Sequence, residues 1–197
     1  MIKKAPRGVA PQDGFSHVQG ASDVPLSTVT LTTLLAGTVS RFSERPAVVF
    51  LEQGVRWTWE EFRALPSEEI TRDIHCVTKW SKLDTVWRGV SVDTLLEGIE
   101  TAADFVIQYS DGGYTTNLPL EDVTGGKAWV VFAYDGQPLA PEHGGPARML
   151  LPQHYFWKSA KWVRGLLLQS ADEPGFWETN GYHNYGDPWQ EQRYSGD

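Results

Sequence analysis

The sequence predicts an α+β domain built on mixed or antiparallel β-sheets with short helices between the strands. Its apolar runs are short, as strands require, and turn signals such as "DGGY" and "DGQPL" follow two of them. No segment repeats at a fixed period, which argues against solenoids and propellers. The clearest strand candidates are "AVVFL", "ADFVIQYS" and "KAWVVFAY".

The composition is that of an ordinary globular chain. Of its 197 residues, 41% are hydrophobic and 21% are charged, which is enough for one substantial core. The formal net charge of -8 argues against a nucleic-acid or anionic-membrane partner. No window reaches the roughly 20 apolar residues of a membrane span, and the start lacks the apolar region of a signal peptide. We therefore expect a cytoplasmic protein, with an irregular arm over residues 1–24 and a single domain over 25–197.

The elements before the only cysteine follow from local patterns. "GVRW" is expected to form a strand after "AVVFL". Thr58 and Glu61 have the spacing of a capping box, so a short helix is expected over "EEFRALP". Ile70 and Ile74 alternate with polar residues, which is typical of a half-buried strand. This strand places Cys76 at or just beyond its end, where functional sites are often assembled.

The elements after the cysteine alternate between a helix and strands. Apolar residues fall at helical spacing before the "ADFVIQYS" strand, and Ser91 or Asp93 could cap that helix. "TTNLPLEDV" is expected to be extended and then briefly helical, ahead of the buried strand "KAWVVFAY". The helical residues are Val92, Leu95, Leu96 and Ile99.

Cys76, in "RDIHCVTKWS", is the only cysteine of the chain, which excludes an internal disulfide and any site with several cysteines. Its own chemistry leaves three roles open: a nucleophile, a metal ligand or a small buried apolar residue. One cysteine and three histidines could also bind zinc, but the spacing of these residues in the sequence matches no standard zinc motif. The residues for such a site would be His75, Cys76, His143 and His154.

The segment from His143 to Leu168, "HGGPARMLLPQHYFWKSAKWVRGLLL", has a concentration of cations that is unusual in this acidic chain. Glycines allow a backbone to approach a ligand closely, and Arg and Lys side chains bind phosphate oxygens. The pattern therefore predicts a site for an anion, although it matches neither a Walker A loop nor a Rossmann turn. Its cations are Arg148, Lys158, Lys161 and Arg164.

Taken together, these motifs resemble the sulfite-oxidase-fold, molybdopterin-dependent oxidoreductases in their short bacterial single-domain form. The resemblance covers roughly residues 47–194 and implies a sulfite-oxidase-type molybdopterin-binding fold. The beginning of the chain lacks the Trp-x-Leu-x-Val-x-Gly strand and the Arg-Asn-His contacts of related proteins, so no cofactor contact is assigned there. The motifs are "DIHCVTKWS", "WRGV", "GYTTNLPL", "DGQPL", "HGGPARMLLPQHYFWKSAKWVRG" and "GFWETNGYHNYGDPWQEQRY".

The resemblance implies that Cys76 is the metal ligand and the catalytic residue, because it aligns with the family's molybdenum-ligating cysteine. A thiolate is a soft donor, suited to a metal that the cofactor's dithiolene already holds. His75 could form a hydrogen bond near the metal, but strand alternation favours a core histidine that points away from Cys76. The implied contacts to the pterin and its phosphate are His143, Gly144, Gly145, Arg148, Lys158, Ser159, Lys161 and Thr78.

The resemblance also implies a reaction: two-electron redox chemistry of the oxygen-atom-transfer type at one molybdenum atom. The expected cofactor is Mo-molybdopterin without haem. The expected partners are a small-molecule substrate and a separate electron carrier, either a protein or a small redox molecule. The substrate stays open between a sulfite-type anion, a sulfoxide and a nitrogen oxide.

Two other functions remain as alternatives. One is a non-catalytic ligand-binding module with Trp and Tyr platforms on the same fold. The other is a small hydrolase with Cys76 as nucleophile and His75 or His143 as base. Aromatic residues are plentiful enough for such platforms, with nine Trp, seven Tyr and eight Phe. Trp129 and Trp162 are predicted to lie in the core and Trp87 in a motif loop, while the aromatic tail is predicted to pack back on the domain.

Overall fold

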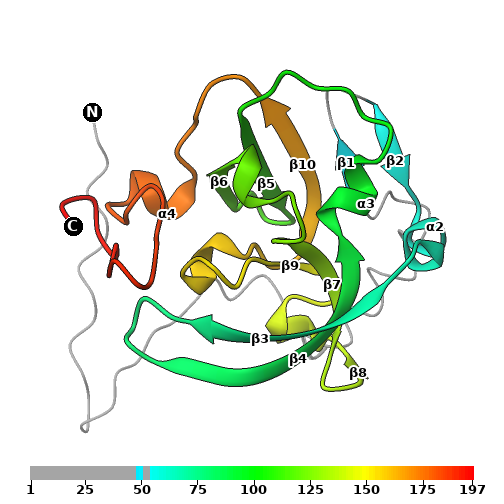
Figure 1. Cartoon of the computed structure of the whole chain (residues 1–197), viewed down its shortest axis with the longest axis horizontal. Helices are drawn as coiled ribbons and strands as arrows, with labels where there is room; N and C mark the ends of the chain where they lie inside the picture. Colours follow the sequence, from blue (N-terminus) through cyan, green and yellow to red (C-terminus); the bar gives the residue numbers. More distant parts are fainter. Residues whose placement is uncertain (1–47, 51–53) are drawn as a thin grey trace, which may run out of the picture. The chain divides into compact units, whose positions relative to one another are not determined.

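The computed structural model describes residues 48–50 and 54–197, so the arm predicted at residues 1–24 lies outside the described residues. Two five-stranded sheets form the described part (Figure 1). The first sheet has the order β2-β1-β10-β5-β6, and its strands are Val55–Trp57, Val48–Phe50, Val163–Gln169, Phe105–Ser110 and Thr115–Pro119. The second has the order β3-β4-β7-β8 with β9 also on β7, and its strands are Glu68–His75, Ser81–Ser91, Trp129–Tyr134, Gln137–Pro138 and Arg148–Leu150.

The sheets are mixed, as the sequence predicts: β1 pairs in parallel with β10, and the other strand pairs are antiparallel. The helices are short, and none in the described residues is long and apolar enough to cross a membrane. They are α2 (Trp59–Ala64), α3 (Val92–Leu96), α4 (Phe176–Thr179) and the 3₁₀ turns η1 (Leu120–Asp122), η2 (Pro141–His143) and η3 (Phe156–Lys158). The predicted α+β class is confirmed.

The predicted caps form as expected. The Thr58 hydroxyl accepts a hydrogen bond from the Glu61 amide at 3.2 Å, and the Glu61 carboxylate accepts one from the Thr58 amide at 2.7 Å. Ser91 caps α3 by accepting a hydrogen bond from the Asp93 amide at 3.1 Å. These side chains satisfy amide groups that the first turn of a helix leaves unpaired.

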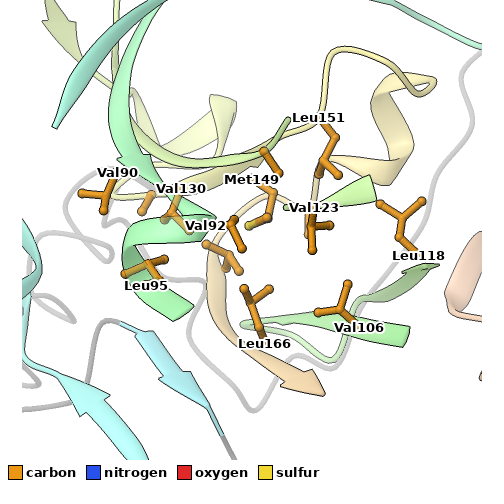
Figure 2. Packing of buried hydrophobic residues seen from close by; sticks show 14 of the residues in the cluster. Val90, Val92, Leu95, Val106, Leu118, Val123, Val130, Met149, Leu151 and Leu166 are labelled. Carbon is orange, nitrogen blue, oxygen red and sulfur yellow. The ribbon is translucent and has the colours of Figure 1, made fainter. Parts of the chain in front are cut away.

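The main core lies between the two sheets. In Figure 2 the side chains of Val106 and Leu166, from the first sheet, face those of Val130 and Met149, from the second. Val106, Val130, Met149 and Leu166 each have 0% of their surface exposed. Burial of these apolar side chains is the main force that holds the sheets together, at roughly 25 cal/mol per Å² of apolar surface.

Strands β4 and β7 approach each other so closely at Gly89 that no side chain fits. A Cβ atom at Gly89 would lie 2.5 Å from the carbonyl oxygen of Val130 and 2.7 Å from the Cα atom of Val131. The β4–β7 register also shifts between Arg88 and Gly89. Glycine in a strand commonly marks such a close backbone approach.

We therefore expect Gly89→Ala to lower the free energy of unfolding by about 1–3 kcal/mol, because strands β4 and β7 would have to move apart. Urea denaturation of the purified protein measures this. Gly196→Ala is a matched control, since a Cβ atom there meets nothing within 4 Å. Equal stability of the two variants would contradict the close approach.

Two tryptophans differ from their predicted environments. Trp87 lies in β4 with 5% of its surface exposed, so it is a core residue and not part of a loop. Trp162 is 36% exposed, although a core position was predicted. Its φ of 51° belongs to a turn, and its indole N–H donates to the Pro141 carbonyl at 2.7 Å. The turn holds the ring on the surface.

Candidate active site

Cys76 is the first residue after β3 and begins the tight turn into β4. Its amide donates to the Trp80 carbonyl at 2.9 Å, and its carbonyl accepts a hydrogen bond from the Lys79 amide at 3.0 Å. Lys79 has a φ of 68°, the left-handed conformation that closes such turns. The Cys76 sulfur lies 3.1 Å from the Thr78 hydroxyl oxygen. The free thiol is thus half-buried at a fixed position at the end of a strand, as predicted.

Cys76 opens onto a hollow of about 300 Å³. Three parts of the chain that are distant in sequence form its walls: the β3–β4 turn, the loop before η3 and the C-terminal segment. A hollow of this size is at the lower end of the range for small-molecule sites. The residues that line it are His75, Cys76, Lys79, Trp80, Ser81, Tyr155, Pro188, Glu191 and Arg193.

His75 lines the same hollow and is only partly buried, so the prediction of a core histidine facing away from Cys76 is wrong. Its Nδ1 lies 2.8 Å from the Ser81 hydroxyl oxygen, and its ring meets the Trp189 ring edge-to-face at 5.3 Å. Strand alternation does not apply across this pair, because β3 ends at His75 and Cys76 already belongs to the turn.

Tyr155 connects the hollow to the cation-rich segment. It forms an isolated β-bridge with His75, and its ring stacks on that of Trp157 with 5.4 Å between centroids. The Arg193 guanidinium carbon lies 4.8 Å from the Tyr155 ring centre. Burial raises the pKa of the Tyr155 phenol, whose hydroxyl has no hydrogen-bond partner among the described residues. Sequence reasoning missed Tyr155, because it is one aromatic residue among many.

Arg148 is a buried cation with 3% of its surface exposed. Its guanidinium donates to the carbonyls of His143 and Ser159, both at 3.0 Å, and lies 4.0 Å above the Phe156 ring. No ion pair with a carboxylate forms at Arg148 among residues 48–50 and 54–197. Burial lowers the pKa of Arg148 to about 9, as expected for a positive charge without a counter-charge.

Lys161 adds a second positive charge near Arg148. Burial lowers the pKa of its ammonium, and so does the Arg148 charge. The ammonium donates to the Glu142 carbonyl at 2.8 Å. Gly144, with a φ of 101°, packs against the Lys161 side chain so tightly that a Cβ atom would lie 3.0 Å from it. The structure therefore brings together Gly144, Arg148 and Lys161, as the anion-site prediction requires.

The other implied contacts have local structural roles in this structure. The Ser159 hydroxyl accepts a hydrogen bond from the Leu151 amide at 2.9 Å. Gly145 is packed against the Leu139 carbonyl, where a Cβ atom would lie 2.1 Å from its oxygen. His143 has an exposed side chain, and its carbonyl accepts the Arg148 hydrogen bond.

Lys158 does not join Arg148 and Lys161 in an uncompensated cluster. Its fully buried ammonium lies 2.7 Å from the Glu178 carboxylate and donates to the carbonyls of Asn117, at 2.8 Å, and Asn184, at 2.6 Å. An ammonium has three N–H donors, and these three partners occupy them. In this structure Lys158 therefore connects the C-terminal segment to β6, and its ammonium has no donor left for a ligand.

The comparisons with known proteins agree with this geometry. The family model described as "Oxidoreductase molybdopterin binding domain" matches residues 48–177. The "Uncharacterized oxidoreductase YuiH" of Bacillus subtilis is 49% identical over 142 residues, which are 71% of this chain and 72% of that protein. The "Putative protein-methionine-sulfoxide reductase subunit YedZ1" of Azospira oryzae is 30% identical over 133 residues, 66% of this chain and 50% of that protein.

Among solved structures, the sulfane dehydrogenase SoxCD from Paracoccus pantotrophus aligns with a TM-score of 0.57 and 21% identity. The alignment covers 66% of this chain and 39% of that chain, and it supports the fold alone. The chain belongs to the molybdopterin-binding oxidoreductase family with the sulfite-oxidase fold. It is therefore an enzyme of that family, and its cofactor is Mo-molybdopterin.

The described residues fit this cofactor in charge and in donor chemistry. Neither Arg148 nor Lys161 forms an ion pair with a carboxylate among the described residues, although the Glu142 charge acts on Lys161, and cations of this kind suit the cofactor's phosphate. Cys76 supplies a soft sulfur donor at the edge of a hollow. Tyr155 and Phe156 link the Cys76 hollow to the cations. Tyr155 forms the β-bridge with His75, and the Arg148 guanidinium lies over the ring of the next residue, Phe156.

Proposed function

We propose that this chain catalyses two-electron oxygen-atom transfer at a molybdenum atom ligated by Cys76. The observation that carries the proposal is the position of the single thiol. It opens onto the hollow and is connected through Tyr155 and Phe156 to a buried, uncompensated Arg148. A nucleophilic hydrolase would need a base in contact with the thiol, but the polar contact described for the Cys76 sulfur is the Thr78 hydroxyl.

When bound, the cofactor supplies the two-electron redox centre. Cys76 would hold the metal through its thiolate, at a position that the turn hydrogen bonds fix. Arg148 and Lys161 would bind the phosphate, since both lie in the cation-rich segment, the Arg148 charge acts on Lys161, and neither forms an ion pair with a carboxylate among the described residues. The hollow would hold the substrate between the β3–β4 turn and the C-terminal segment and limit the access of water.

As the substrate we propose a sulfoxide or a nitrogen oxide, which gives up one oxygen atom. Reduction of a sulfoxide consumes two electrons and two protons and yields a sulfide and water, so a separate electron carrier is needed. Names among the relatives support these classes: a protein-methionine-sulfoxide reductase subunit and, at 28% identity over 118 residues, an inducible nitrate reductase of Glycine max. The chain spans 50% and 13% of these two proteins.

The test is to express the protein with molybdate in a host that makes the cofactor. We expect about one molybdenum atom per chain, an extractable oxidised pterin, and reduction of methionine sulfoxide or nitrate with a reduced viologen dye as donor. Absence of molybdenum, tungsten and pterin would contradict the proposal and favour a non-catalytic binding module. Metal and pterin without turnover of either compound would leave the cofactor assignment standing and refute the substrate classes.

A further inference from the structure

The C-terminal segment forms one wall of the Cys76 hollow. We call residues 187–197 the C-terminal strap; the family model ends before it, at residue 177. In Figure 1 this red part of the chain lies on the same side as the β3–β4 turn. Pro188, Glu191 and Arg193 line the hollow, and the Trp189 ring lies 5.3 Å from that of His75.

The strap has its own internal hydrogen bonds. The Asp187 carboxylate accepts from the Trp189 amide at 2.8 Å and from the Gln190 amide at 3.2 Å. The Asp197 carboxylate accepts from the amides of Arg193, at 2.8 Å, and Tyr194, at 2.7 Å. These bonds satisfy backbone donors at two successive bends, so the strap presents Arg193 from an ordered backbone.

Arg193 connects the strap to the cysteine turn. Its guanidinium donates to the Val77 carbonyl at 2.8 Å, across 116 positions of sequence, and covers the Tyr155 ring. The Arg193 side chain is 14% exposed, and its ion pair with the exposed Glu191 has an N–O distance of 3.4 Å. Val77 directly follows Cys76, so this hydrogen bond fixes the carbonyl of the residue next to the ligand position.

The hydrogen bonds within the cysteine turn are local. The backbone bonds join Cys76 to Trp80 and to Lys79, and the sulfur contacts Thr78. In the described part of the chain, the Arg193 bond is the one hydrogen bond that joins the turn from Cys76 to Trp80 to a distant segment. A bond from a charged donor is stronger than one from a neutral donor. Its loss would therefore release the turn while leaving β3 and β4 paired.

We propose that Arg193 is a positioning residue for Cys76: it holds the Val77 carbonyl and so fixes the cysteine turn against the strap. The consequence for turnover rests on the proposed function. The effect on the cysteine turn is independent of the proposed function, because the Arg193 contacts are all made within the protein chain.

The first test is amide hydrogen exchange on cofactor-free protein, comparing wild type, Arg193→Ala, Arg193→Lys and Arg164→Ala. Arg164 is a matched control because its ion pair, with Asp111 at 3.5 Å, lies outside the hollow. In Arg193→Ala we expect the protected amides of Cys76 and Lys79 to exchange about tenfold faster, and those of β7 to be unchanged. Arg193→Lys keeps the charge without the planar guanidinium, so partial restoration is expected.

Wild-type exchange in the turn of Arg193→Ala would overturn the proposal. Equal acceleration in the turn and in β7 would also overturn it, because Arg193 would then act on global stability. If Arg193→Lys exchanges as fast as Arg193→Ala, the planar guanidinium is required for the bond, which agrees with the proposal. Faster exchange in Arg164→Ala at the turn would show that the effect is not specific and would overturn it.

The second test uses the molybdenum-loaded enzyme. We expect Arg193→Ala to keep its molybdenum content, to lose roughly tenfold to a hundredfold in kcat, and to show an altered electron paramagnetic resonance signal of the metal. A merely structural residue would lower the melting temperature without changing that signal or kcat, and this result would overturn the proposal. If wild-type protein binds no molybdenum, the proposed function fails, while the exchange experiment still decides the role of Arg193.

Discussion

Cys76→Ser is expected to abolish oxidoreductase turnover, with kcat falling about a thousandfold or more, while the fold stays intact. A serine hydroxyl is a hard, weakly acidic donor and cannot replace a thiolate as a ligand for a high-valent metal. The substitution fits sterically, because the residue is half-buried in a turn and its side chain contacts the Thr78 hydroxyl. The measurements are kcat with a reduced dye, molybdenum content and the melting temperature.

A matched control is Ser81→Ala, which removes a hydroxyl from the wall of the same hollow. That hydroxyl contacts His75 at 2.8 Å, so at most about a tenfold effect on kcat is expected, the size of a lost secondary contact. Full turnover in Cys76→Ser would show that the thiol is not the metal ligand. Metal-independent ester hydrolysis that stops when the wild-type thiol is alkylated would instead support the nucleophile alternative.

Local signals in the sequence predicted much of the fold. The capping box at Thr58, the alternation of Ile70 and Ile74 and the cap at Ser91 each depend on residues a few positions apart. Strand β4 was not predicted, because its first four residues are all exposed and show no alternation of apolar and polar residues. These four residues extend the β3–β4 hairpin that carries Cys76. Strand β10 gives a weak strand signal, because Arg164 and Gly165 interrupt its apolar residues.

In the candidate site, too, the residues within one short motif could be predicted from the sequence, whereas those that reach the site from a distant segment could not. The sequence singles out Cys76 as a lone thiol at a strand end and Arg148 as part of a contiguous cation-rich motif, while the role of Cys76 as metal ligand is implied by the family resemblance. Arg193 could not be found, since it reaches the site across 116 positions of sequence through one backbone hydrogen bond. Composition also cannot distinguish a lysine that is free to bind a ligand from one that is already paired with a carboxylate. Lys158 is already paired, and its partner Glu178 lies in α4, distant in the sequence.

Lys158→Met is expected to lower the free energy of unfolding by about 3–5 kcal/mol, the cost of leaving one partner of a buried ion pair alone. The Lys158 ammonium and the Glu178 carboxylate are 0% and 1% exposed and lie 2.7 Å apart. Glu178 would keep hydrogen bonds from Thr116, at 2.9 Å, and from the Trp157 indole, at 3.0 Å, but would lose its counter-charge. Urea denaturation of the full chain measures the difference.

The double variant Lys158→Met/Glu178→Gln separates the charge effect from packing. It removes both charges and keeps an oxygen for Thr116 and Trp157, so we expect it to be more stable than Lys158→Met alone. The exposed pair of Arg164 and Asp111 is the matched control: Arg164→Ala should cost less than about 1 kcal/mol, because solvent screens that pair. A Lys158→Met variant as stable as Arg164→Ala would contradict the buried pair. The C-terminal segment would then be held mainly by its aromatic contacts, such as Trp157 against Tyr182 at 5.0 Å.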